Sequence, residues 1–175
     1  IEPHFLFNAL NTIASTIHTD PDLADTLLVR LAALLRAATD LSRRSETTLD
    51  EELRLLEGYA AIMRQRFADR VDLRFDTAGA PPTCRVPTLI LQPLLENAVY
   101  HGIEPSPVPA TLTINIFLSR GEVHAIMRNP YRDDGGRHHR GNRMAIANIR
   151  ERLALHFDAE AALENRRRLQ ATRES

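Results

Sequence analysis

One stretch of the sequence carries more polar chemistry than its apolar surroundings explain: Gln92-Pro93-Leu94-Leu95-Glu96-Asn97-Ala98-Val99-Tyr100-His101-Gly102. Asn97 and His101 are four residues apart and so share one face of a helix, with Glu96 beside them. Buried amide, carboxylate and imidazole groups are costly without partners. A magnesium-bound triphosphate would supply them, because an amide oxygen can bind this hard cation. For this stretch alone, a helix end with solvent-facing polar residues is an alternative.

The segments around this stretch predict an α+β fold. Pro87 opens the helix that carries it, and we expect that helix to reach about Gly102. Alternation of apolar and polar residues predicts strands at 71–76, 112–118 and 123–128, the last two forming a hairpin. Loops are expected at 79–82, 105–109 and 129–141, and a last helix at 146–157.

The first third of the chain predicts two helices and the start of a third. The apolar stripe of the first helix consists of Leu6, Leu10, Ile13 and Ile17. Asp20 and Pro21 then cap and open a second helix, whose apolar arc extends from 23 to 41. The capping-box pattern at 48–51 begins the third helix. Its apolar stripe consists of Leu53, Leu56, Ala60, Met63 and Phe67.

This pattern predicts a division into two parts. Two helices alone make a poor core, so we expect residues 1–47 to form a helical hairpin that dimerises with a second copy. Residues 48–175 would then form an α+β domain with helices on one face of a sheet.

Composition excludes few classes of function. The formal net charge is −1 over 175 residues, which gives no bulk electrostatic argument for binding nucleic acid or an anionic membrane. The single cysteine, Cys84, suits a reducing compartment. No apolar run approaches the roughly 18 residues that span a bilayer. The chain lacks an initiating methionine, so we expect it to be a fragment.

Two further patches carry candidate chemistry. His4 lies at the start of a helix with Asn8 one turn on, where a neutral imidazole can accept a phosphoryl group and Asn8 can orient it. A plain surface histidine is the alternative. Near the C-terminus, Gly141 permits close approach of phosphate to a helix start, and Arg140 and Arg143 can add charge-assisted contacts. A flexible surface loop is the alternative there.

Together the patches resemble a known family, the LytS-like sensor histidine kinases and their AlgZ-like branch. His4-Phe5-Leu6-Phe7-Asn8 with Leu10-Asn11-Thr12-Ile13 resembles the phospho-acceptor box of that family. The stretch from Gln92 to Gly102 resembles its nucleotide-binding N box. The segment Asn148-Ile149-Arg150-Glu151-Arg152-Leu153 resembles the region after its last glycine box.

The resemblance implies a Bergerat-type (GHKL) ATP-binding α/β sandwich behind a dimeric helical bundle that carries His4. It implies transfer of the γ-phosphoryl of ATP to His4 and then to an aspartate in the receiver domain of a response regulator. Asn97 would hold Mg²⁺, Glu96 would help to activate His4, and His101 would approach the phosphates. The resemblance also implies an upstream membrane sensor, and therefore a place at the cytoplasmic face of the bacterial inner membrane.

The sequence departs from the family pattern at the adenine and glycine boxes. An aspartate is usual after the hairpin, yet this chain has Asn129, whose side-chain oxygen can still accept a hydrogen bond, followed by Pro130. Arg143 and Ala145 stand where glycines are expected. A degenerate, weakly ATP-binding dimeric module or phosphatase is therefore an alternative to an active autokinase. A third alternative is an ATPase of the same fold that has no role in signalling. The His4 box argues against this alternative, because such an ATPase needs no phospho-acceptor helix.

Overall fold

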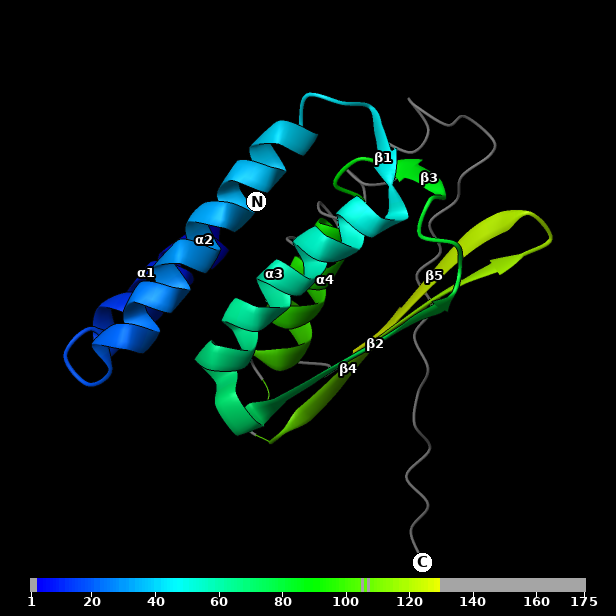
Figure 1. The fold of residues 1–175 in the computed structure, drawn as a ribbon. Helices are drawn as coiled ribbons and strands as arrows, with labels where there is room; N and C mark the ends of the chain where they lie inside the picture. The colour runs from blue at the N-terminus through cyan, green and yellow to red at the C-terminus, as the bar shows by residue number, and fades with distance from the viewer. Residues whose placement is uncertain (1–2, 105, 107, 130–175) are drawn as a thin grey trace, which may run out of the picture.

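The computed structural model of the protein describes residues 3–104, 106 and 108–129. Its elements form three layers (Figure 1). A hairpin of two helices packs on a second helical layer, and a three-stranded sheet covers the far side of that layer. The α+β class predicted from the sequence is confirmed. The helix predicted at 146–157 lies outside the described residues, and the Bergerat sandwich stays a prediction.

The first layer consists of α1 (Pro3–Thr16) and α2 (Pro21–Leu41). Asp20 caps α2 as predicted, because its carboxylate accepts a 3.0 Å hydrogen bond from the backbone N–H of Leu23. One face of α2 is buried against α1 and the next helix, and its buried residues are Ala24, Leu27, Leu31, Leu34, Ala38 and Leu41. The predicted helical hairpin is therefore present.

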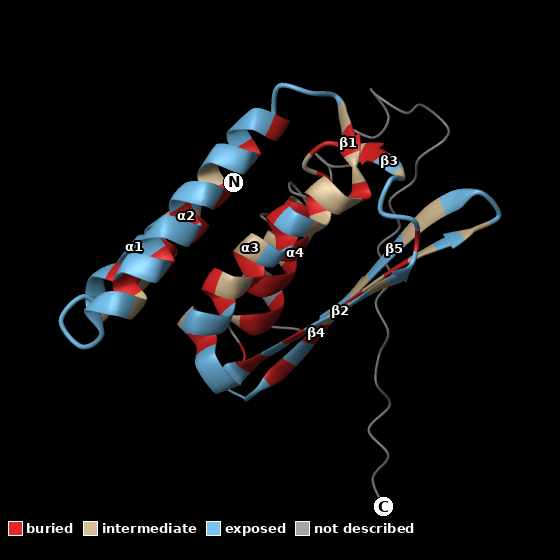
Figure 2. Cartoon of the chain, viewed as in Figure 1, coloured by how far each residue is buried: buried red, intermediate tan, exposed pale blue. Residues whose placement is uncertain are grey.

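The buried face of α1 differs from the predicted one. Phe5, Ala9 and Ile13 are buried, whereas Leu10 and Ile17 of the predicted stripe are about half exposed. The ring of Phe5 packs against the ring of Tyr59 in α3, with centroids 4.3 Å apart. Since the hairpin docks on α3, the contact with that helix sets the orientation of α1. The outer surface of the hairpin remains exposed, as Figure 2 shows.

The second layer begins with a short sheet that the sequence did not predict. Strands β1 (Glu46–Thr48) and β3 (Arg85–Pro87) pair antiparallel and join the start of α3 (Leu49–Phe67) to the segment before α4. Three residues per strand are too few for a periodic signal. Pro87, expected to open a helix, instead ends β3.

The start of α3 is fixed by the predicted capping box. Thr48 accepts from the N–H of Glu51, whose carboxylate accepts from the N–H of Thr48. The same carboxylate accepts from Arg44 at 2.8 Å and from the Thr47 hydroxyl. These hydrogen bonds, that of Arg44 foremost, lower the pKa of Glu51 to about 2.

This lowered pKa predicts a pH-dependent contribution of Glu51 to stability. A carboxyl group whose pKa is lower in the folded state stabilises the fold above its unfolded pKa, about 4.3, and loses that effect as the pH falls toward 2. The variant Glu51→Gln should therefore unfold at a lower urea concentration than the parent at pH 6, and the difference should shrink at pH 3. An equal difference at both pH values would contradict the assignment.

The sheet comprises β2 (Val71–Gly79), β4 (Ala110–Ser119) and β5 (Glu122–Arg128), in the order β2-β4-β5. The central strand β4 pairs parallel with β2 and antiparallel with β5. The predicted hairpin at 112–128 is confirmed. On the inner face, which packs toward α3 and α4, the buried residues include Leu73, Leu112, Ile114 and Ile116.

The N-box stretch folds as α4 (Leu91–Ala98), followed by a π-helical turn, η2 (Val99–Ile103). The helix thus begins later than predicted and changes hydrogen-bond pattern within the motif. The N–H of Glu104 closes the wider turn on the carbonyl of Val99 at 3.0 Å. π-Helical turns are rare in proteins overall, and those that occur are often found at functional sites.

One buried core runs through all three layers, from Phe5 in α1 to Ile116 in β4. It therefore crosses the predicted boundary at residue 47, and the division into 1–47 and 48–175 stays a prediction. Among the described residues, no helix combines the length and apolar character required to cross a bilayer.

Candidate functional site

His4 lies in the first turn of α1, with its side chain 44% exposed. The amide nitrogen of Asn8, one turn further on, is 3.1 Å from each ring nitrogen. An ordinary i, i+4 helical spacing is enough to bring the two side chains together. Asn8 therefore lies beside His4, and its role in orienting a phosphoryl group stays a prediction. The imidazole is accessible to a second molecule.

The imidazole also contacts the end of the N-box stretch, about 100 residues away in sequence. The ring of Tyr100 meets it edge to face, with centroids 5.0 Å apart and the planes at 83°. The carboxylate of Glu104 is 4.0 Å from His4 Nδ1. Glu104 in turn accepts a 2.6 Å hydrogen bond from Arg66 at the end of α3. The structure thus brings two of the three sequence patches together.

Sequence reasoning missed Glu104 and Arg66. Glu104 lies two residues after the end of the motif, but nothing in a single sequence links it to a histidine at position 4. Arg66 was read only as part of a helix. A search for charged residues flanking the motif would have identified Glu104 as a candidate site residue. It would not have identified His4 as the residue that Glu104 contacts.

Helix α4 positions Glu96 and Asn97, both half-buried. Gln92 Nε2 donates a 2.9 Å hydrogen bond to Glu96 Oε1, one turn along. The start of α4 is held by a residue that sequence reasoning passed over. Glu52 of α3 is 1% exposed, and its carboxylate accepts from the backbone N–H groups of Leu89, Ile90 and Leu91.

The residues present fit a magnesium–nucleotide complex in their donor chemistry. Within the described part of the chain, no group of three His, Cys, Asp or Glu side chains could hold a metal ion by itself. Magnesium is commonly bound by one or two protein oxygens together with phosphate oxygens. The amide oxygen of Asn97 suits that arrangement, in which a nucleotide supplies the remaining ligands. The Oε1 atom of Gln92, buried one turn before Glu96, has no hydrogen-bond partner among the residues that the structure describes.

Several predicted site residues cannot be placed. The side chain of His101 and the whole of Arg140, Gly141 and Arg143 lie outside the described residues. Asn129 directly follows β5 and is exposed. Its predicted contact with adenine, like the phosphate contacts of the other four residues, stays a prediction.

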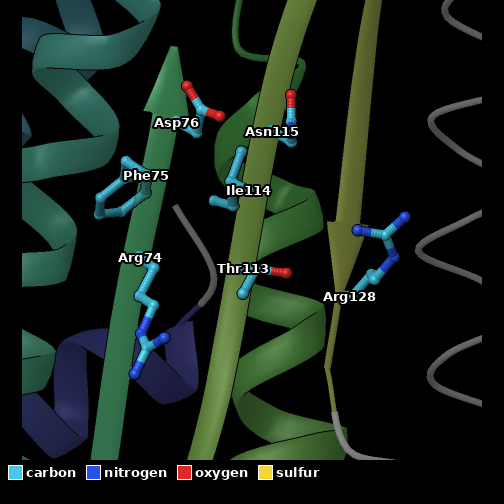
Figure 3. A pocket seen from close by; sticks show the side chains of 7 residues that line it. All are labelled: Arg74, Phe75, Asp76, Thr113, Ile114, Asn115 and Arg128. Atoms are coloured by element: carbon cyan, nitrogen blue, oxygen red, sulfur yellow. The ribbon is translucent and has the colours of Figure 1, made fainter.

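A cavity on the sheet lies apart from these residues. It is lined by Arg74, Phe75, Asp76, Thr113, Ile114, Asn115 and Arg128 (Figure 3). In this view α4 lies behind the strands. None of the lining residues belongs to the N-box stretch.

Comparison with known proteins identifies similar chains. The family model described as histidine kinase matches residues 1–71. The chain is 36% identical over 129 residues to the sensor histidine kinase YpdA of Escherichia coli, covering 74% of this chain and 23% of that protein. It is 30% identical over 183 residues to the sensor protein LytS of Oceanobacillus iheyensis, covering 94% and 31%.

A third relative is the sensor protein kinase HptS of Staphylococcus aureus, 35% identical over 127 residues, covering 72% of this chain and 24% of that protein. The chain thus spans between about a quarter and a third of the length of these relatives. The matched region includes both the His4 segment and, in the longest alignment, nearly the whole chain.

Proposed function

The chain belongs to the LytS-like sensor histidine kinases, and on that basis we propose that it is the transmitter part of one. It transfers the γ-phosphoryl group of ATP to His4, and from His4 to an aspartate of a response-regulator receiver domain. The observation that carries this proposal is the position of His4, exposed at a helix start and in contact with the end of the N-box stretch.

Each site residue has a separate role in the transfer of the phosphoryl group from ATP to His4. His4 supplies the nitrogen lone pair that attacks phosphorus, and Asn8 donates to the ring or to the incoming phosphoryl group. Asn97 holds Mg²⁺, which, when bound, offsets the charge of the triphosphate. Glu96 helps to activate His4. His101, Asn129, Arg140, Gly141 and Arg143 contact the nucleotide in this proposal.

The proposed mechanism is tested by following phosphate from γ-labelled magnesium-ATP into the chain. We expect a label that is lost in acid and retained in alkali, as for a phosphorus–nitrogen bond, and that maps to the peptide containing His4. An acid-stable label, or one on another peptide, would overturn the assignment of the acceptor. No label in a folded, dimeric sample would favour the weakly ATP-binding alternative.

The proposal includes a homodimer built through the helical hairpin. Apolar side chains remain on its outer surface: Phe7 is 68% exposed and Val29 61%. On α1, Phe7, Leu10 and Ile17 recur at steps of three and seven, so they form one stripe. A contiguous exposed apolar stripe of this kind is typical of an interface, and a second hairpin would complete a four-helix bundle.

Charges on the exposed apolar surface of the two hairpin helices should prevent dimerisation. We expect the double variant Phe7→Glu, Val29→Glu to sediment as a monomer at concentrations where the parent is a dimer, because it buries two carboxylates in an apolar interface. Leu118→Glu, at an exposed position on β4, serves as the matched control and should remain dimeric. If the double variant remained a dimer, the dimer interface would not include Phe7 and Val29.

The receiver domain would dock on the outer faces of α1 and α2 near His4, where Asn11 and Ser15 are exposed. The complete protein would carry a membrane sensor upstream and lie at the cytoplasmic face of the inner membrane. Both statements rest on the family of the chain. Alanine at Asn11 and Ser15 should slow transfer to the regulator and leave labelling of His4 by ATP unchanged.

A further inference from the structure

The carboxylate of Glu104 lies beside one of the two ring nitrogens of His4. Its Oε1 atom is 4.0 Å from Nδ1 of the ring. The edge of Tyr100 limits how far the ring can turn. Hydrogen bonds at catalytic groups are often longer before the substrate binds and shorten in the complex. A small rotation of the His4 side chain would close this contact.

Glu104 itself is held firmly. Its Oε1 atom accepts a 2.6 Å hydrogen bond from Arg66, and both side chains are about four-fifths buried. Its backbone N–H is bonded to the carbonyl of Val99. The ion pair with Arg66 holds the Glu104 carboxylate in place. His4 therefore faces a fixed, negatively charged group.

We propose that Glu104 is a positioning residue that holds His4 in the tautomer protonated on Nδ1, so that Nε2 is the nucleophile. This inference rests on the proposed function, in which His4 is phosphorylated. Once the contact closes, a carboxylate that accepts a hydrogen bond from Nδ1 requires the proton on that nitrogen. Asn8, which is equally near both ring nitrogens, then donates to the lone pair of Nε2 and releases it when the nucleotide arrives.

The tautomer fixes the course of the reaction. The lone pair of Nε2 forms the bond to the γ-phosphorus, while the bond from that phosphorus to the bridging oxygen breaks and its electrons leave with ADP. The ring, now substituted at Nε2 and still protonated at Nδ1, carries a positive charge. Glu104 stabilises that charge and accepts the Nδ1 proton as the neutral phosphohistidine forms.

The first test is a direct measurement of the tautomer. The chain has seven histidines, so the ¹⁵N signals of His4 in ¹⁵N-histidine-labelled protein are assigned by their absence from His4→Gln. At about pH 8 we expect Nδ1–H in the parent. Glu104→Gln should shift His4 toward Nε2–H, the form that free histidine favours in water. Glu57→Gln, an exposed glutamate on α3, is the matched control and should leave it unchanged.

Autophosphorylation provides the second readout. Glu104→Gln should lower kcat for labelling by magnesium-ATP about 100-fold with little change in KM for the nucleotide. Glu104→Asp, which keeps the carboxylate, should recover part of the rate. A purely structural role for Glu104 would move KM and kcat together and would leave the tautomer as it is. Nε2–H in the folded parent would overturn the inference.

Chemical phosphorylation separates this inference from the proposed function. Phosphoramidate can phosphorylate an accessible imidazole without nucleotide, and we expect it to give the Nε2-phosphohistidine at position 4. A mainly Nδ1-phosphorylated product would overturn the inference. If ATP gives no label while the tautomer and the Nε2 product are as expected, the kinase proposal fails and the role of Glu104 stands.

Discussion

His4→Gln and Asn97→Ala are both expected to abolish labelling by γ-phosphate, and to do so for different reasons. His4→Gln removes the acceptor nitrogen and leaves the N-box helix intact, so magnesium-nucleotide binding should be unchanged. Asn97→Ala removes the proposed magnesium ligand, so nucleotide affinity should fall by about 100-fold or more, in keeping with the loss of a metal contact. The two variants therefore distinguish a defect in the phosphoryl acceptor, His4, from a defect in the nucleotide site.

Three measurements distinguish these variants: labelling, nucleotide binding by calorimetry, and chemical phosphorylation by phosphoramidate. Asn97→Ala should still accept phosphate from phosphoramidate at His4, whereas His4→Gln should lose that product. His18→Gln and Asn11→Ala, at exposed positions, are the matched controls and should label like the parent. Wild-type nucleotide affinity in Asn97→Ala would remove this residue from the proposed metal site.

Replacing Glu52 with alanine should cost about 3 kcal/mol of the free energy of unfolding. The carboxylate accepts from three successive backbone N–H groups at the start of α4, and hydrogen bonds to a charged group contribute about 1.5–3 kcal/mol each, with incomplete additivity. The turn it holds includes Leu89 at φ 55°, a conformation that a leucine rarely adopts.

Urea unfolding of Glu52→Ala, Glu52→Gln and the exposed control Glu57→Ala measures this effect. The glutamine variant keeps one acceptor oxygen and should lose about half as much stability as the alanine variant. Glu57→Ala should change stability by less than about 0.5 kcal/mol. If Glu52→Ala were as stable as the control, water or another group would be capping α4, and Glu52 would not be required to position the N box.

Local signals predicted much of the fold from the sequence. Asp20 and the capping box at Thr48 and Glu51 act within three residues, so their patterns gave the helix starts correctly. Alternation predicted the strands because one face of the sheet packs on helices. The pairing of His4 with Asn8 likewise depends only on helical spacing.

Non-local contacts account for what was missed. Glu52 caps a helix that begins 39 residues later, and its place in the acidic first turn of α3 gave no hint of that partner. The β1–β3 pair joins residues about 40 apart through strands of three residues. The face of α1 depends on which side of the helix meets Tyr59. The Glu52 cap, the β1–β3 pair and the buried face of α1 all depend on tertiary packing. The periodicity of apolar residues along the chain does not predict such contacts.

Helix α1 has two apolar edges, and this has a mechanical consequence. Phe5 and Ala9 are buried within the chain, while Leu6 and Leu10 follow them by one residue, or about 100° of rotation. A turn of α1 by about this angle would exchange one edge for the other and would break the contact between Phe5 and Tyr59. It would also swing His4 away from Glu104. The packing of the first helix would therefore be coupled to the position of the proposed phospho-acceptor.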